Sequence, residues 1–340
     1  MPKAISPIEF LEKAQFIPII DVRSPGEFEK AHIPGAYNIP LFDNEERAKV
    51  GTKYKNAGKD AAVLLGLGIV GPQLADFVKS AKKLTTDKSV LVHCWRGGMR
   101  SGSFAWLLET AGFQANIMEG GYKAYRNMVL SFFEKPMNLI VLGGKTGSAK
   151  TETLHQLQHL GEQIIDLEGI ANHQGSAFGA IGQKEQPSSE FFENLLFEKF
   201  QKLDLTKRIW IEDESKNIGT CNIPLPLWDK MRASKVLFLD IEPEARIPFL
   251  VEKYAQAGVD TELQESLNRI QKRLGGQQFN EATKALKIKN YADVAKITLE
   301  YYDKWYLMGL QKREEKQVFK IITQSNNPKL NAHLLLDFLK

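Results

Sequence analysis

The side chain with the clearest chemical potential is Cys94, which follows the apolar run at residues 90–92 and precedes a helical spacing of apolar residues. The run predicts a buried strand, so residues 94–100 form the loop between strand and helix. Helix N-terminal amides and the charges of Arg96 and Arg100 would lower the pKa of this thiol and create an anion site. A buried structural cysteine is the alternative. The other residues of this anion loop are Trp95, Gly97, Gly98 and Met99.

The same loop allows a second interpretation. His93-Cys94, five residues, and then Arg100-Ser101 match the H-C-x-x-x-x-x-R-S pattern of cysteine-dependent phosphatases. A loop of this length closes around a tetrahedral anion, with Arg100 as a bidentate clamp. The sequence offers no visible general acid for a phosphatase leaving group, which weakens this interpretation but leaves it open.

A glycine-rich segment after the apolar run at 139–142 could bind phosphate. It matches the P-loop pattern G-x-x-x-x-G-K-T from Gly144, except that Ala149 replaces the glycine before Lys150. If position 149 needs a positive φ, alanine costs about 1–2 kcal/mol there, so tight nucleotide binding does not follow. A glycine-rich turn beside a structural lysine is the alternative. The expected diphosphate-binding residues are Gly144, Lys145, Thr146, Gly147, Ser148, Lys150 and Thr151.

Polar residues elsewhere could complete this second site. Glu212 and Asp213 end the apolar run at 209–211, where a P-loop protein keeps a carboxylate that faces Mg²⁺. Thr151 with Asp213 is the candidate Mg²⁺ pair, with Glu212 as the alternative; a solvated strand end is equally consistent. Asp240 after the run at 236–239 has similar standing. A polar loop with His173, Gly175 and Ser176 suggests further site residues without naming a ligand.

The bulk composition is that of an ordinary soluble protein. The chain has 340 residues, of which 25% are charged and 43% hydrophobic, and its net charge of +4 permits an RNA partner without predicting one. Cys94 and Cys221 are too far apart in sequence to suggest a disulfide framework or a zinc site. We see no signal peptide and no apolar stretch near the ~20 residues that cross a bilayer. We therefore expect a cytoplasmic protein without a membrane partner.

The strands and helices that must position these residues follow an alternating pattern. Apolar runs at 17–20, 90–92, 139–142, 209–211 and 236–239 alternate with helical patterns, which predicts α/β architecture with parallel sheets. Pro136 interrupts the pattern before a new strand, so we expect domains at 1–133 and 137–340. Residues 263–274, 290–310 and 330–339 read as amphipathic packing helices of the second domain.

The first domain resembles the rhodanese family in four segments. They are residues 21–28, residues 32–40, the Cys94 loop and residues 119–122, in the expected order within about residues 5–130. The resemblance implies that Cys94 carries a chalcogen atom as a persulfide. It also implies that Asp21 and Arg23 support the underside of the loop. We expect His32 to stabilise its own turn, because a histidine in such a turn usually bonds to its own backbone.

The whole chain resembles the tRNA 2-selenouridine synthase family, because a P-loop domain follows the rhodanese-like domain directly. Residues 44–54, 166–179, 212–215 and 273–276 strengthen the match. The resemblance implies a rhodanese-like parallel-sheet domain, then a P-loop NTPase-like α/β domain with C-terminal helices. It also implies a transferase that replaces sulfur by selenium at C2 of wobble 2-thiouridine in tRNA, through an S-geranyl intermediate.

The implied co-substrates are geranyl diphosphate, held by the P-loop around Lys150, and selenophosphate, received by Cys94, Arg96 and Arg100. No tightly bound cofactor is expected besides a candidate Mg²⁺ ion. The expected partners are tRNA with 2-thiouridine at the wobble position and an enzyme that supplies selenophosphate. Basic side chains could follow the tRNA backbone, although a solvated helix face explains them equally well: Arg269, Lys272, Arg273, Lys284, Lys287 and Lys289.

Two other functions stay open. One is a P-loop NTPase or kinase fused to a rhodanese sulfurtransferase or a cysteine phosphatase, which NTP turnover would favour. The other is an inactive rhodanese module that acts as a phosphate sensor or scaffold, against which the intact cysteine and both loop arginines argue.

Overall fold

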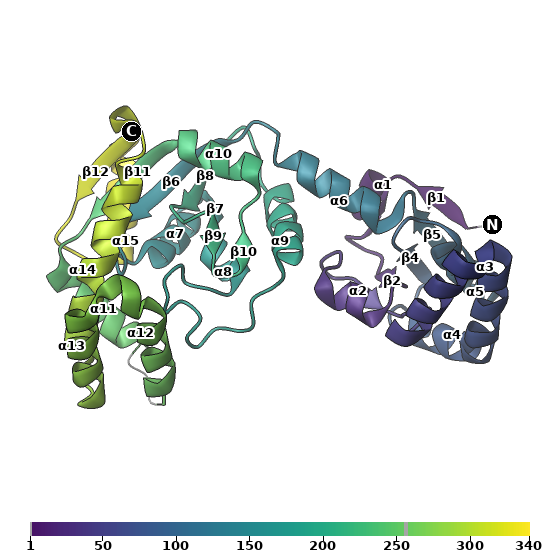
Figure 1. The fold of residues 1–340 in the computed structure, drawn as a ribbon. Helices are drawn as coiled ribbons and strands as arrows, with labels where there is room; N and C mark the ends of the chain where they lie inside the picture. Colours follow the sequence, from purple (N-terminus) through teal and green to yellow (C-terminus); the bar gives the residue numbers. More distant parts are fainter. Residues whose placement is uncertain (1, 255–257) are drawn as a thin grey trace. The chain divides into compact units, whose positions relative to one another are not determined.

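The computed structural model describes residues 2–254 and 258–340, which form two compact units (Figure 1). The first unit holds the chain up to Phe132 together with Glu193–Leu195. The second holds Phe133–Phe192 and Leu196–Lys340.

The first unit is built on a five-stranded parallel sheet in the order β1-β5-β4-β2-β3. Its strands are β1 Lys3–Ile5, β2 Ile19–Asp21, β3 Tyr37–Asn38, β4 Ser89–His93 and β5 Gln114–Met118. Its helices are α1 Pro7–Lys13, α2 Pro25–Lys30, α3 Asn44–Val70, the short 3₁₀ helix η1 Gly71–Gln73, α4 Leu74–Lys82, α5 Met99–Thr110 and α6 Gly121–Phe132.

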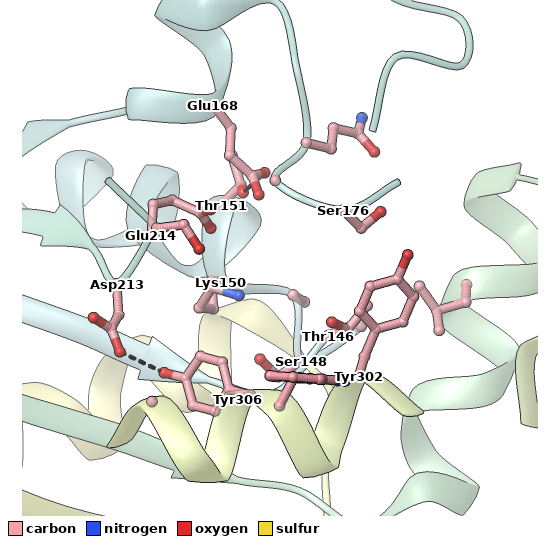
Figure 2. A pocket seen from close by; sticks show the side chains of 18 of the residues that line it. Thr146, Ser148, Lys150, Thr151, Glu168, Ser176, Asp213, Glu214, Tyr302 and Tyr306 are labelled. Atoms are coloured by element: carbon pink, nitrogen blue, oxygen red, sulfur yellow. Dashed lines mark hydrogen bonds between the residues drawn. The ribbon is translucent and has the colours of Figure 1, made fainter. Parts of the chain in front are cut away.

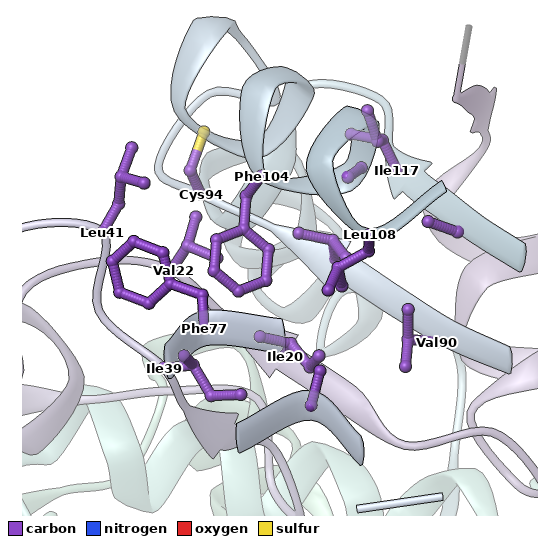
Figure 3. Packing of buried hydrophobic residues seen from close by; sticks show 14 of the residues in the cluster. Ile20, Val22, Ile39, Leu41, Phe77, Val90, Cys94, Phe104, Leu108 and Ile117 are labelled. Carbon is purple, nitrogen blue, oxygen red and sulfur yellow. The ribbon is translucent and has the colours of Figure 1, made fainter. Parts of the chain in front are cut away.

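Strand β4 lies at the centre of this sheet, and its apolar residues are fully buried. Val90 and Val92 pack with Ile20 of β2, Phe77 of α4 and Phe104 of α5 in one hydrophobic cluster. Cys94 lies at the edge of that cluster, and Figure 3 shows its sulfur pointing away from the labelled apolar side chains. The core therefore fixes the backbone of the loop while the thiol faces its rim.

The second unit has its own five-stranded parallel sheet, in the order β12-β11-β6-β8-β7. The strands are β6 Asn138–Gly144, β7 Gln163–Ile165, β8 Arg208–Glu212, β11 Lys235–Asp240 and β12 Val318–Ile322, and β9 Asn217–Ile218 pairs with β10 Cys221–Asn222. The helices that follow β6 along the chain are α7 Lys150–His159, α8 Leu167–Ala171, α9 Ser189–Gln201, α10 Leu225–Ala233, α11 Pro243–Tyr254, α12 Asp260–Leu274, α13 Gly276–Lys287, α14 Tyr291–Leu310, the 3₁₀ helix η2 Glu315–Gln317 and α15 Pro328–Phe338.

Two hydrophobic clusters stabilise the second unit. One surrounds the sheet, where Leu142 of β6, Leu154 of α7 and Trp210 of β8 are fully buried. The other is helical and includes Phe178, with Leu267 of α12. Because β6 lies between β8 and β11, its carboxyl end delivers the following loop to the middle of the sheet, where open parallel sheets bind ligands.

The fold confirms the predicted α/β class with parallel sheets. Each of the five predicted apolar runs overlaps a strand, and the three predicted amphipathic helices correspond to α12, α14 and α15. The short edge strands β1, β3 and β7 were not predicted, because so short a run has no clear periodicity, and the five-residue strands β5 and β12 were not predicted either.

We expected no stretch that is apolar enough to cross a membrane, and this expectation is wrong for one segment. The helical region Asn44–Lys82 contains an 18-residue window of mean hydropathy 1.7, which is long and apolar enough to cross a membrane, and 17% of that window is buried. Leu64 and Leu67 there are 73% and 63% exposed. Two features interrupt the helix, a non-helical Gly58 with φ of +82° and the 3₁₀ turn η1. The absence of a membrane partner therefore stays a prediction.

Candidate functional sites

The first turn of α6 holds the Cys94 loop in place through two backbone hydrogen bonds. The backbone amide of Tyr122 donates to the Cys94 carbonyl oxygen at 2.9 Å, and that of Lys123 donates to the Trp95 carbonyl oxygen at 2.9 Å. Gly121 has a φ of +57°, and a Cβ there would lie 2.4 Å from the Cys94 carbonyl oxygen. Residue 121 must therefore be glycine for the loop to close.

The thiol of Cys94 is buried and lies 3.2 Å from the Ser101 hydroxyl of α5. Burial alone raises its pKa, but the Ser101 hydroxyl, the amides of Ser101 and Arg96 and the charge of Arg100 outweigh burial and lower the pKa below the ordinary value. A lowered pKa makes the thiolate, the nucleophilic form, more abundant at neutral pH. The surroundings of this sulfur therefore favour the thiolate, and its role as a reactive group stays a prediction.

The two loop arginines differ in their surroundings. Arg100 is half-buried and donates from Nη1 to Glu27 at 3.1 Å, whereas Arg96 is exposed. Glu27 also lies 3.6 Å from Arg47 of α3. Glu27 thus holds the guanidinium of Arg100. The role of Arg100 as a clamp on a bound anion stays a prediction.

The remaining predicted residues of the anion loop lie around it in different ways. Trp95 is half-buried, with its ring 5.7 Å from that of Tyr122. Gly97 has a φ of +63°, which favours glycine, while Gly98 precedes the first turn of α5. Met99 begins α5 and is 55% exposed, so its side chain is accessible to solvent.

Asp21 and Arg23 are paired in the buried interior, and the turn contact expected for His32 is present, whereas support of the Cys94 loop by Asp21 and Arg23 stays a prediction. The buried Arg23 side chain donates from Nε and Nη2 to Asp21 and from Nη2 to the Ala31 carbonyl oxygen at 2.8 Å. His32 uses Nδ1 for a 2.9 Å hydrogen bond with the Phe28 carbonyl oxygen, within its own turn.

The second site is a pocket of about 550 Å³ at the end of β6. Residues 146–151 line it, and Figure 2 shows the amine of Lys150 pointing into the space between Glu214 and Tyr302. The same amine donates to the Gly144 carbonyl oxygen at 3.1 Å. Ala149 has a φ of +52° in the left-handed region, which confirms that the alanine takes the strained conformation that a P-loop glycine relieves.

Carboxylates surround one side of the phosphate loop. The Thr151 hydroxyl lies 2.7 Å from Glu212 and 2.9 Å from Glu168. Burial, with the neighbouring charge of Glu168, raises the pKa of Glu212 well above its ordinary value and that of Glu214 to about 8. Burial disfavours the charge on Lys150, but these carboxylates outweigh it and raise the lysine pKa. Lys150 therefore stays a cation at neutral pH.

Asp213 faces other partners. It accepts hydrogen bonds from Tyr306 at 2.8 Å and from Arg313 at 2.6 Å. The predicted pairing of Thr151 with Asp213 is therefore wrong. Glu212, the alternative acid at the end of β8, is the one that contacts Thr151. Asp240 is also engaged, in an ion pair with Lys145 at 3.0 Å.

The predicted polar loop with His173, Gly175 and Ser176 contributes only part of its residues to this pocket. Gly175 and Ser176 line it, whereas His173 is buried outside its lining. Gly175 has a φ of +68°, and a Cβ there would lie 2.6 Å from a Glu214 carboxylate oxygen. The glycine therefore lets the loop pass close to the acidic side of the pocket.

The sequence reading missed the other walls of the pocket. Glu168 and Glu214 supply acidic groups, and α14 supplies Tyr302, Trp305 and Tyr306. The aromatic spacing on α14 was visible in the sequence, but it also fits a packing helix. Glu168 precedes the polar loop that contains His173. Its contact with Thr151, which the sequence does not reveal, marks it as a site residue.

No metal centre made of side chains alone is evident within residues 2–254 and 258–340, where three or more His, Cys, Asp or Glu groups are nowhere arranged to hold an ion. Thr151, Glu168 and Glu212 offer only hard oxygen atoms. Mg²⁺ is commonly held by one or two carboxylates together with substrate phosphates. This donor set fits an ion that arrives with a phosphorylated substrate.

Comparison with known proteins adds independent findings. A family model described as the tRNA 2-selenouridine synthase AAA domain matches residues 137–332, and one for a rhodanese-like domain matches residues 8–128. The chain is 34% identical to the tRNA 2-selenouridine synthase of Shewanella pealeana over 352 residues, covering 93% of this chain and 95% of that protein. Its identity to the protein of that name from Pseudomonas syringae pv. syringae is 37% over 295 residues, with coverage of 77% and 76%.

Among solved structures, an N-terminal domain of a protein from Clostridium difficile 630 is 42% identical and covers 38% of this chain and 99% of that domain, with a TM-score of 0.36.

Proposed function

This chain belongs to the tRNA 2-selenouridine synthase family, and on that premise we propose that it is an enzyme that acts on tRNA. Its reaction replaces sulfur by selenium at C2 of the wobble 2-thiouridine, in two steps. Geranyl diphosphate first alkylates the sulfur, and selenophosphate then supplies selenium. The observation that carries the proposal is the pocket of the second unit, where a phosphate loop with a charged lysine faces an aromatic wall.

The first step requires a leaving diphosphate. The thiouridine sulfur attacks C1 of the geranyl group, the C1–O bond breaks, and the diphosphate departs with the electron pair while N3 of the base loses its proton. Backbone amides of residues 146–151 and the Lys150 cation would stabilise the negative charge that develops on the diphosphate. The aromatic side chains of α14 would face the apolar geranyl group.

Mg²⁺ is a candidate ion for this step. When bound, it would neutralise part of the diphosphate charge. Thr151, Glu168 and Glu212 would hold it, because the Thr151 hydroxyl lies 2.9 Å from Glu168 and 2.7 Å from Glu212 and all three offer oxygen atoms.

The second step belongs to the Cys94 loop in this proposal. Selenium of selenophosphate bonds to C2, the C2–S bond breaks, and geranyl thiol leaves with one proton. Water then cleaves the Se–P bond and releases phosphate. The loop amides, Arg96 and Arg100 would bind the phosphate group next to Cys94, which would position the donor so that its selenium faces C2.

The tRNA itself is the expected macromolecular partner. An anticodon-loop base is unpaired and can be turned outward onto aromatic or arginine side chains. Arg273 of α12 lines the pocket of the second unit, while Arg269 and Lys272 are exposed on the same helix. These side chains could contact tRNA phosphates and make binding salt-dependent.

One observation favours a second candidate function, NTP hydrolysis. Glu212 ends the strand beside β6 and contacts Thr151, as the Mg²⁺-side acid does in P-loop NTPases. The strained Ala149 argues against tight nucleotide binding.

Nucleoside mass spectrometry tests the proposal. Thiolated tRNA is incubated with the protein, geranyl diphosphate and selenophosphate, and each donor is omitted in turn. We expect 2-selenouridine with both donors and S-geranyl-2-thiouridine when selenophosphate is left out. Unchanged tRNA in all mixtures, together with NTP turnover, would favour the second candidate instead.

A further inference from the structure

A second, smaller cavity of about 50 Å³ adjoins the phosphate-loop pocket. The two share five lining residues, which are Thr146, Ser176, Leu250, Tyr254 and Tyr302. The other lining residues of the small cavity are Phe178, Val251, Leu263, Tyr291, Val294, Ala295, Thr298 and Leu299, of which Phe178, Leu263, Tyr291 and Val294 belong to the helical core of the second unit. The space therefore leads from the phosphate loop into an apolar part of the protein.

The lining of the small cavity is unsuited to water or a charged ligand. Its lining residues in the described chain include no Asp, Glu, Lys or Arg. The Tyr254 hydroxyl donates to Gln174 at 2.6 Å, the Tyr302 hydroxyl accepts from the Ala177 amide at 3.1 Å, and the Thr298 hydroxyl donates to the Val294 carbonyl oxygen at 2.8 Å. The Tyr291 hydroxyl donates to Asp260 at 2.7 Å, and the Ser176 hydroxyl accepts from the Phe178 amide at 3.2 Å. A buried water needs two to four polar partners, and most of the lining hydroxyls already have partners in the protein. An apolar ligand fits the cavity better.

Helix α14 connects the two cavities turn by turn. Tyr306 accepts a hydrogen bond from the Gly144 amide of the phosphate loop, and Tyr302, one turn earlier, lines both cavities. Thr298 lies one further turn away, Val294 and Ala295 follow after about one more, and Tyr291 lies about one turn beyond them. A helical turn rises about 5.4 Å, which is close to the span of one isoprene unit. A chain that follows α14 inward therefore meets Thr298 and then Val294 and Ala295 as it grows by isoprene units.

We propose that the small cavity binds the terminal part of the prenyl chain of the diphosphate substrate, beyond the larger pocket, and that Val294 and Ala295, on its α14 wall, limit the chain length. This rests on the proposed function, in which the phosphate loop holds geranyl diphosphate. The diphosphate lies at Lys150, C1 lies at the aromatic wall near Tyr302, and the chain follows α14 inward.

Competition among prenyl diphosphates tests this assignment. Thiolated tRNA is incubated with equal amounts of dimethylallyl, geranyl and farnesyl diphosphate, and the S-prenyl nucleosides are quantified by mass spectrometry. We expect A295L to raise the dimethylallyl-to-geranyl ratio at least tenfold, the size of discrimination that a misfitted methylene gives in an apolar pocket. V294A should raise the farnesyl-to-geranyl ratio instead.

The matched control is I270V, because Ile270 is buried in the same helical core but does not line the cavity. It should keep the wild-type ratios. Unchanged ratios in active A295L and V294A would overturn the cavity assignment while leaving the proposed function intact. If A295L does not fold, V294A alone decides. A wild-type protein that transfers none of the three prenyl groups would overturn the proposed function and this inference with it.

Discussion

The Tyr306 hydroxyl donates a 2.8 Å hydrogen bond to the carboxylate of Asp213, which lies 93 residues earlier in the chain (Figure 2). The same hydroxyl accepts a hydrogen bond from the Gly144 amide at 3.0 Å. One side chain of α14 thus ties the start of the phosphate loop to the end of β8. Because the aromatic wall of the pocket lies on this helix, the tie also sets the distance between that wall and the loop.

Removing this tie should destabilise the second unit. In Y306F the Gly144 amide loses its acceptor and Asp213 loses one donor, so we expect the free energy of unfolding to fall by about 1–3 kcal/mol. Urea denaturation followed by tryptophan fluorescence measures the change. Tyr54 is 59% exposed, and Y54F is the control that should leave the free energy unchanged. Equal stability of Y306F and the wild-type protein would contradict the structural role of this hydrogen bond.

The two cysteines should differ sharply in reactivity. Burial raises the pKa of Cys221 to about 11, whereas the pKa of Cys94 lies below its ordinary value. Since the thiolate is the nucleophile, iodoacetamide at neutral pH should label Cys94 in the folded protein and leave Cys221 unlabelled. Peptide mass spectrometry after a short exposure measures both sites. Equal labelling of the two cysteines would be incompatible with the described surroundings of Cys94.

Ser101 should control the pH dependence of Cys94. In S101A the thiolate loses the hydroxyl at 3.2 Å, so its pKa should rise. The pH of half-maximal alkylation then moves upward. A depressed thiol pKa adds folding stability above the pKa of the unfolded state, which is lost as the pH falls through the folded-state pKa. S101A should therefore be less stable than the wild type mainly at alkaline pH. S103A, on an exposed part of α5, is the control, and an unshifted alkylation profile in S101A would exclude this role.

In the proposed reaction, selenium transfer takes place at the Cys94 loop of the first unit. C94S should abolish conversion of S-geranyl-2-thiouridine tRNA to 2-selenouridine tRNA and retain geranylation of thiolated tRNA. Supplying tRNA that has already been geranylated isolates the second step. C221S is the matched control, because it removes the other buried thiol and should retain both steps. Normal selenation by C94S would refute the role of this sulfur.

Lys145 and Lys150 should contribute unequally, although both belong to the phosphate loop. Lys145 is paired with Asp240, while Lys150 points into the pocket (Figure 2). We expect K145A to lower the rate of geranylation less than K150A does, and steady-state kinetics with varied geranyl diphosphate would measure both losses. A larger loss in K145A would assign the diphosphate contact to the other lysine.

The parts of the molecule that depend on local sequence were predictable. The Cys94 loop and the phosphate loop each consist of neighbouring residues between a strand and a helix, so their types and spacing mark them directly. Contacts made through tertiary packing were not. Nothing near Thr151 in the sequence indicates Glu212 as its partner over Asp213, and the roles of Tyr306 and Arg313 arise from segments far from the loop. The exposed apolar residues Leu64 and Leu67 were likewise hidden, because helical spacing does not reveal which face lacks a partner.

The most direct test of the central claim, that the phosphate loop carries geranyl transfer, is to assay K150A in the two steps separately. One reaction contains thiolated tRNA and geranyl diphosphate, and the other contains geranylated tRNA and selenophosphate. We expect K150A to lose S-geranyl-2-thiouridine formation and still to convert geranylated tRNA to 2-selenouridine tRNA. Geranylation by K150A at the wild-type rate would contradict this claim.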